Sequence, residues 1–283
     1  MKCYPLKLMW LSRLFFLALV FSSAHCGYAQ TIYPDTVKIF KLRDANAFMS
    51  TDHLGGLYIV QRNEVTKYPN PIHSKKRMRF SDPQNGEIAH IDAFNPLAIL
   101  LLYKPFNLIQ IVDNQLNRST ANISPEQFNI MDVQLAATSD ENTVWIFDQS
   151  SDRLQRLDIS QRRVAFQSQI ITKLAGKEVE PNYLVANMNG VYLNCPEIGI
   201  LVFDFFGNYK KLIPIPGLKR FQVKHQNIVY WQDGMLQLQS IDLPKHTQLR
   251  IPGIEPRHVR LEDKYLFIQT KDAVVVIVNP LEG

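Results

Sequence analysis

The stretch NYLVANMNGVYLNCPEIGILVFDFFGNYKKLIPI, residues 182–215, decides the fold. It contains short apolar segments that are rich in aromatic and β-branched residues, and Gly, Asn, Asp or Pro stands between them. Segments of this kind, bounded by turn residues, are typical of β-strands. Several are apolar on consecutive residues, which indicates strands that are buried on both faces. The stretch therefore predicts one small sheet with an inner, a second, a third and an outer strand.

The same unit recurs along the chain. The bulky centres of the second strands lie 36 to 47 residues apart, at Tyr58, Leu101, Trp145, Tyr192, Tyr230 and Leu266. A period of about 40 residues made of strands is the signature of a β-propeller, with one blade per repeat. The repeat around Leu101 is the least regular, and we assign its outer strand to residues 119–123. No linker divides the repeats, so they predict one all-β domain.

The last repeat is incomplete. RHVRLED, KYLFIQ and AVVVIV supply three strands within residues 257–278, and no fourth strand follows them. A spare strand, DTVKIFKL at residues 35–42, precedes the first complete repeat. Pairing the two would close the ring and remove an exposed sheet edge. We therefore expect a six-bladed β-propeller over residues 30–283, with its last blade closed by an N-terminal strand.

Residues 1–29 have the layout of a secretory signal peptide. Basic residues precede the apolar run LFFLALVF (residues 14–21), and Gly27 and Ala29 occupy the small-residue positions before a cleavage site. The run is well short of the roughly 20 residues that span a bilayer, which disfavours a membrane anchor. A lipoprotein signal at Cys26 is the alternative. We expect cleavage near Ala29, with the mature protein periplasmic, secreted or at the cell surface and without a transmembrane span.

Removal of this segment changes the charge of the chain. The full sequence carries a formal charge of +5, with 31 basic and 26 acidic residues. The signal contains no acid and three bases, namely Lys2, Lys7 and Arg13. The mature chain therefore has 28 bases against 26 acids, or +2, and nucleic acid is not an expected partner. The basic run SKKRMRF, residues 74–80, is interpreted as an outer edge strand whose charges prevent edge pairing.

The mature chain keeps one cysteine, Cys195, because Cys3 and Cys26 fall in the signal. A single cysteine forms neither an internal disulfide nor a zinc cage. Its place in VYLNCPE indicates a semi-buried strand end rather than a nucleophile. We therefore expect the exported domain to be stabilised by burial of its core.

The stretch FMSTDHLGGLYIV, residues 48–60, brings Ser50, Asp52 and His53 together in the sequence. On the repeat template it is an inner strand, a hairpin turn and a second strand. Neighbouring residues on a strand point to opposite faces, so this order does not build a Ser-His-Asp triad. His53 and His225 share the same offset from the centres of their second strands, and turn chemistry explains both.

The segment DENTVWIFD, Asp140 to Asp148, resembles the repeat of NHL and TolB-like six-bladed propellers, which reads roughly Asp-x-x-Gly-x-x-Tyr-Val-x-Asp. Asp52 to Val60 and Asn187 to Leu193 match this pattern in part. The motif is structural. The resemblance therefore implies the propeller fold and carries no particular activity.

Propeller ligands bind at the channel, where the innermost strands converge. The polar residues on the expected innermost strands are His90, Asp92, Asn187, Gln222, Lys224, His258 and Arg260. Alternate positions share a face, so His90 pairs with Asp92 and His258 with Arg260. Lactonase-type six-bladed hydrolases hold a divalent metal in the channel by Glu, Asp and Asn, and the comparable candidates here are Glu87, Asp92, Asp132 and Asn182.

These observations favour a non-catalytic function over an enzyme. We expect an exported, monomeric ring that acts as a protein-binding or scaffolding module in a bacterial cell-envelope complex, with an envelope or surface protein as its partner and no cofactor. The alternative is a metal-dependent lactonase-like or sugar-active enzyme with its site in the channel. A sensor of a small ligand or glycan is a third possibility.

Overall fold

The computed structural model describes residues 30–33, 35–138 and 142–281. The expected signal peptide, including Cys26, lies outside the described residues, and so do Asp140 and Glu141 of the repeat motif. Within the described ranges, no helix is long and apolar enough to cross a membrane.

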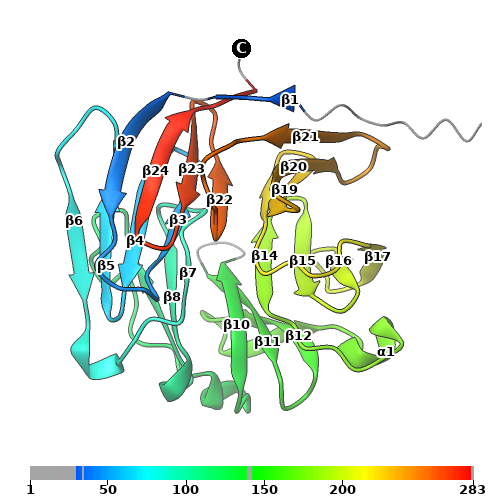
Figure 1. The fold of residues 1–283 in the computed structure, drawn as a ribbon. Coiled ribbons are helices and arrows are strands. Elements are labelled where there is room, and N and C mark those ends of the chain that lie inside the picture. The colour runs from blue at the N-terminus through cyan, green and yellow to red at the C-terminus, as the bar shows by residue number, and fades with distance from the viewer. Residues whose placement is uncertain (1–29, 34, 139–141, 282–283) are drawn as a thin grey trace, which may run out of the picture.

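The described residues form six small sheets arranged around a central axis, which is a six-bladed β-propeller (Figure 1). Blade 1 contains β3 (Phe48–Thr51), β4 (Leu57–Gln61), β5 (Glu64–Tyr68) and β6 (Met78–Ser81). Blade 2 contains β7 (His90–Asp92), β8 (Ile99–Tyr103) and β9 (Leu108–Val112). Blade 3 contains β10 (Val133–Thr138), β11 (Thr143–Asp148), β12 (Arg153–Asp158) and β13 (Arg163–Gln167).

Blade 4 contains β14 (Tyr183–Asn187), β15 (Gly190–Cys195), β16 (Gly199–Phe203) and β17 (Tyr209–Ile213). Blade 5 contains β18 (Gln222–Lys224), β19 (Asn227–Gln232), β20 (Met235–Ser240) and β21 (His246–Arg250), and the short β1 (Gln30–Thr31) joins it. Blade 6 contains β22 (His258–Leu261), β23 (Tyr265–Gln269), β24 (Ala273–Val278) and β2 (Thr36–Lys41). Neighbouring strands within each blade are antiparallel, except that β1 lies parallel to β21.

The ring closes as the sequence predicts. Strand β2 pairs antiparallel with β24, with Phe40 opposite Val274, and supplies the outer strand of blade 6. The parallel pairing of β1 with β21, which places Thr31 opposite Arg250, was not expected. The start of the described chain therefore crosses the outside of two blades (Figure 1).

The predicted outer strand of blade 2 is wrong. Residues 119–123 form only an isolated bridge between Ile123 and Ile109. The backbone N–H of Ser119 also donates to the carbonyl oxygen of Ile111 at 3.0 Å, and between these contacts the side-chain Nε2 of Gln110 donates to the carbonyl oxygen of Thr120 at 3.0 Å. The expected edge strand at residues 74–80 is also shorter than predicted, since β6 begins at Met78.

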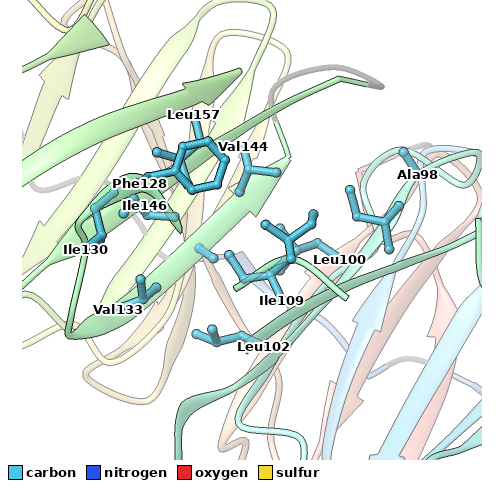
Figure 2. Packing of buried hydrophobic residues seen from close by; sticks show 13 residues of the cluster. Ala98, Leu100, Leu102, Ile109, Phe128, Ile130, Val133, Val144, Ile146 and Leu157 are labelled. Atoms are coloured by element: carbon cyan, nitrogen blue, oxygen red, sulfur yellow. The ribbon is translucent and has the colours of Figure 1, made fainter. Parts of the chain in front are cut away.

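Hydrophobic clusters join every pair of neighbouring blades in the described structure. Between blades 2 and 3, Leu100 and Leu102 of β8 face Val144 and Ile146 of β11 (Figure 2). All five residues of β8 are buried, as expected for a strand covered on both faces. Each such fully buried side chain contributes about 1.5–3 kcal/mol relative to an exposed one, so packing between the blades stabilises the ring.

The turn between β3 and β4 is built around the buried carboxylate of Asp52. Its Oδ1 accepts hydrogen bonds from the backbone N–H groups of Leu54 (3.0 Å) and Gly56 (2.7 Å), and its Oδ2 accepts one from the Tyr58 hydroxyl (2.8 Å). The ammonium of Lys67 lies 4.0 Å away, also buried. The predicted hairpin is confirmed, with Asp52 one residue beyond the end of β3.

Candidate functional site

The innermost strand of each blade lines the central axis (Figure 1). We call the end where innermost strands turn into second strands the hairpin face; it carries the turns at residues 52–56, 93–98, 188–189, 225–226 and 262–264. We call the opposite end the crossover face, because the chain passes there from one blade to the next; it carries residues 82–89, 124–132, 168–182, 214–221 and 251–257.

Toward the hairpin end of the innermost strands, charged side chains are held by neighbouring blades. The guanidinium of Arg260 donates to the hydroxyl of Thr51 from Nε at 3.0 Å and to its carbonyl oxygen from Nη2 at 3.3 Å. The carboxylate of Asp92 accepts from the backbone N–H and the hydroxyl of Thr138, both at 2.8 Å, and from the N–H of Phe94. Burial raises the pKa of Asp92, and these hydrogen bonds and Arg260 oppose that effect.

The hairpin face opens into a cavity of about 380 Å³, the hairpin mouth, lined by residues of blades 1, 2, 4, 5 and 6. Its floor is polar. The ammonium of Lys224 lies 2.7 Å from Asp263 and 3.7 Å from Glu262. The Glu262 carboxylate also accepts from the Gln222 amide at 3.1 Å and from the Thr51 hydroxyl. Burial raises the pKa of Glu262, whereas the surrounding cations and donors favour its ionised form.

The turns of the hairpin face carry exposed apolar side chains, which we call the rim, and of these Met188 and Phe94 line the cavity. Leu54 is 73% exposed, Leu97 60% and Met188 87%, and they lie in the innermost hairpin turns of blades 1, 2 and 4. Phe94, in the same turn as Leu97, lines the cavity itself. This rim could not be predicted from the sequence, because single apolar residues in separate turns form no sequence pattern.

His53 and His225 also line the hairpin mouth. The Nδ1 atom of His53 lies 2.9 Å from the carbonyl oxygen of Phe94, and His225 adopts a left-handed backbone conformation with φ of 52°. Both therefore belong to turns, as the sequence predicts, and the shared offset places them at one mouth. Asn187 and Lys224 lie in the same lining, whereas His90 lies outside it.

At the crossover face, two adjoining cavities of about 590 and 250 Å³ are found in the described structure, and we call them together the crossover mouth. They share four lining residues, namely Lys219, Arg220, Arg257 and His258. The guanidinium of Arg220 lies 5.0 Å from the ring centre of Phe48 and 5.8 Å from that of Tyr183. His90 contacts the same Tyr183 ring edge-on, at 5.6 Å between ring centres.

The two channel histidines are buried and surrounded by cations. Burial lowers the pKa of His90 to about 3, and Arg220, Lys104 and Arg260 act in the same direction. Burial also lowers the pKa of His258 well below its ordinary value, again with help from Arg220 and Arg260. Both imidazoles are therefore neutral near pH 7. Of the predicted residues, His258 lines the crossover mouth and Arg260 the hairpin mouth, His90 lies close enough to Arg260 to feel its charge, and Asp92 is turned toward blade 3.

The candidate metal ligands are not brought together. Glu87 forms an exposed ion pair with Arg62 at 3.1 Å, and the side chain of Asn182 accepts from Asn194 at 2.6 Å. Asp132 interacts with Gln134 and Lys104, the latter through charge. Among the residues that the structure describes, no group of three His, Cys, Asp or Glu side chains is placed to hold a metal ion.

Cys195 is the last residue of β15 and is buried. Burial raises the pKa of its thiol to about 12, and the carboxylates of Glu197 and Asp152 add to this effect. The thiolate is therefore scarce near neutral pH. This matches the interpretation of Cys195 as a structural strand end.

Comparison with solved structures shows the fold alone. A chain in the structure of the mitotic checkpoint complex matches 87% of this chain and 91% of its own length, at 7% identity and a TM-score of 0.61. Virginiamycin B lyase from Staphylococcus aureus matches 85% of this chain and 99% of its own, at 9% identity and a TM-score of 0.59. A streptogramin B lyase gives 9% identity, coverage of 86% and 98%, and a TM-score of 0.57.

No protein-family model matches the sequence, and no curated protein matches it either. The resemblance to the NHL and TolB-like repeat therefore stays a prediction, while the propeller fold itself is confirmed.

Proposed function

We propose that this chain is an exported, non-catalytic β-propeller that binds a protein partner of the bacterial cell envelope through its hairpin mouth. The observation that carries the proposal is the apolar rim around a polar floor. A ring of this kind would act as a scaffold, because its blades are fixed to one another by continuous hydrophobic packing.

The rim supports a protein as the ligand. Scattered exposed apolar residues are normal on a soluble protein, but a group of them around one cavity marks an interaction surface. Leu54, Phe94, Leu97 and Met188 lie in the hairpin turns of blades 1, 2 and 4 on the same face, and Phe94 and Met188 line the cavity. Methionine adapts its shape to a partner, and aromatic side chains are enriched at the centre of protein interfaces.

The floor supports a particular kind of partner segment. Lys224 and Arg260 are balanced by Glu262 and Asp263, so the floor offers donors and acceptors without a strong net charge. Such a floor suits a loop or chain end whose polar tip enters the mouth while flanking apolar side chains cover the rim. Because the ring is preorganised, little ordering accompanies binding on this side.

The export part of the proposal rests on the signal layout of residues 1–29. Cell fractionation and N-terminal sequencing of the mature protein test this part, and a cytoplasmic chain that keeps its first residues would overturn it.

A photo-crosslinking experiment tests the partner. The crosslinking amino acid is placed at position 188, on the hairpin rim, and in a matched variant at position 131, an exposed methionine on the crossover face. We expect a discrete crosslinked envelope protein from position 188 and none from position 131. The same partner, once purified, should bind the double variant L54E/M188E about tenfold more weakly or worse, and M131E normally.

Unchanged binding by L54E/M188E, or equal crosslinking from both positions, would refute the hairpin mouth as the docking surface. The melting temperature of each variant is measured beside binding. All three substituted side chains are exposed, so the fold should tolerate them.

A further inference from the structure

We infer that the crossover mouth binds a small organic anion, with an oxyanion group held by Arg220 and an apolar or aromatic part against the cavity wall. This site is on the opposite end of the channel from the proposed protein-docking rim. It is independent of that proposal and rests on different residues.

Arg220 has a guanidinium group whose N–H donors are available to a ligand. Within the described structure, no hydrogen bond or ion pair joins its guanidinium to another residue, although the side chain is partly buried. The rings of Phe48 and Tyr183 hold it from blades 1 and 4 instead. An arginine fixed by aromatic rings keeps its N–H donors available, and these donors match the geometry of a carboxylate or phosphate.

The histidines near Arg220 are buried and have no hydrogen-bond partner among the described residues. His258 is only 5% exposed and lines both cavities, and His90 is 7% exposed. No hydrogen bond to a described residue reaches either imidazole. Buried polar groups are normally hydrogen-bonded, and the imidazole of His258, which lines both cavities, is therefore available to a ligand or to solvent there. A neutral imidazole offers one N–H group, which an oxyanion accepts.

The third observation is the charge of the lining. Lys219, Arg220 and Arg257 contribute cations, and no carboxylate belongs to the described lining of either cavity. The channel carboxylate of Asp92 already accepts three hydrogen bonds from blades 2 and 3. At the hairpin mouth, by contrast, each cation of the floor has an acidic neighbour. A water-accessible cavity with one sign of charge concentrates ligands of the other sign.

The fourth observation is the size and the wall of the site. The larger cavity, of about 590 Å³, falls in the range of small-molecule sites, and the adjoining cavity of about 250 Å³ extends it. Trp231 lines the larger cavity and Phe48 the smaller one. These rings give an apolar surface to the part of the ligand that carries no charge. The site therefore favours an organic anion over a free inorganic ion.

Binding to the purified mature protein tests the inference. Isothermal titration and two-dimensional NMR of the histidine rings are measured with phenyl phosphate, benzoate, inorganic phosphate and neutral benzamide, in buffers that contain no carboxylate or phosphate. We expect phenyl phosphate or benzoate to bind in the micromolar to low millimolar range and to shift the His90 and His258 signals. Comparison of these two anions distinguishes a phosphate ligand from a carboxylate ligand.

The variant R220Q should lose about tenfold or more in affinity, because it removes the charged donor at the centre of the site. The control R79Q replaces an exposed arginine on β6 and should bind the probes normally. If R220Q does not fold, R257Q replaces it, since Arg257 is exposed and its loss should weaken binding several-fold.

Unchanged affinity in the folded R220Q variant would overturn the inference, and so would the absence of binding by both organic anions up to about 10 mM. Equal affinities for inorganic phosphate and phenyl phosphate would refute the contribution of the apolar wall. Binding of benzamide as tight as that of benzoate would refute the role of charge.

Discussion

Acidification should destabilise the propeller through the buried histidines of its channel. In the folded chain, the pKa of His90 is about 3, against an ordinary value of 6.5, because the ring is buried beside Arg220 and other cations. The unfolded chain therefore binds more protons between pH 6.5 and about 3, and stability falls as the pH is lowered through this window. His258 acts in the same direction.

The magnitude follows from the shift of His90. Each pH unit below 6.5 costs about 1.4 kcal/mol of unfolding free energy for one such group, so lowering the pH to 4.5 removes about 2.7 kcal/mol. That is a large part of the 5–15 kcal/mol typical of folded domains. The raised pKa values of Asp92 and Glu262 oppose this loss, because these carboxyls take up protons in the folded state.

Comparing the unfolding free energies of wild type and H90Q separates the contribution of His90 from that of the carboxyls of Asp92 and Glu262. Urea unfolding of the wild type and H90Q is followed from pH 7 to pH 4.5, in buffers without carboxylate or phosphate. As the pH falls over this range, the unfolding free energy of the wild type should decrease by about 2.7 kcal/mol more than that of H90Q. H246Q, which replaces an exposed histidine on β21, controls for the loss of one imidazole. A gap between wild type and H90Q that stays constant with pH would refute the reasoning.

Three further predictions concern the buried framework. The variant D52N should lose about 3 kcal/mol in urea unfolding, because Lys67 then stays buried 4.0 Å from a neutral group; a loss below about 1 kcal/mol would contradict this. The variant G199A should lose more than about 3 kcal/mol or fail to fold, since a Cβ atom would lie 2.2 Å from the carbonyl oxygen of Ile213, and thermal unfolding checks it. The thiol of Cys195 should react with a soluble disulfide reagent only after unfolding, because burial raises its pKa to about 12; rapid labelling of the folded chain would contradict this.

The blades could be predicted from the sequence because their determinants are local. Apolar runs and turn residues alternate along each repeat, and the missing last strand has an obvious replacement in residues 35–42. Strand β1 could not be predicted, since Gln30 and Thr31 are polar and their parallel partner lies more than two hundred residues away. The prediction of an outer strand in blade 2 was wrong, since residues 119–123 make only isolated backbone contacts with β9 and the Gln110 side chain bonds to Thr120 between them.

The candidate site was only partly predictable. Positions on the innermost strands, such as His90 and Arg260, were expected at the channel because every innermost strand lines it. Arg220 was missed because it lies in a loop before β18, where sequence patterns do not reveal which side chains turn toward the axis. Glu87 and Asn182 were metal-ligand candidates only under the enzyme alternative, and each has a local partner, Arg62 and Asn194 respectively.

The closing pair of strands also sets an order of events in biosynthesis. A chain is made from its N-terminus, so β2 emerges first among the strands of blade 6, and β24 emerges after all the others. Phe40 therefore cannot pair with Val274 until β24 has been made, and the ring stays open until nearly all of the described chain has been synthesised. Contacts so distant in sequence form slowly. Any chain that stops early exposes two unpaired sheet edges, which makes fragments of this propeller prone to aggregation and open to proteases.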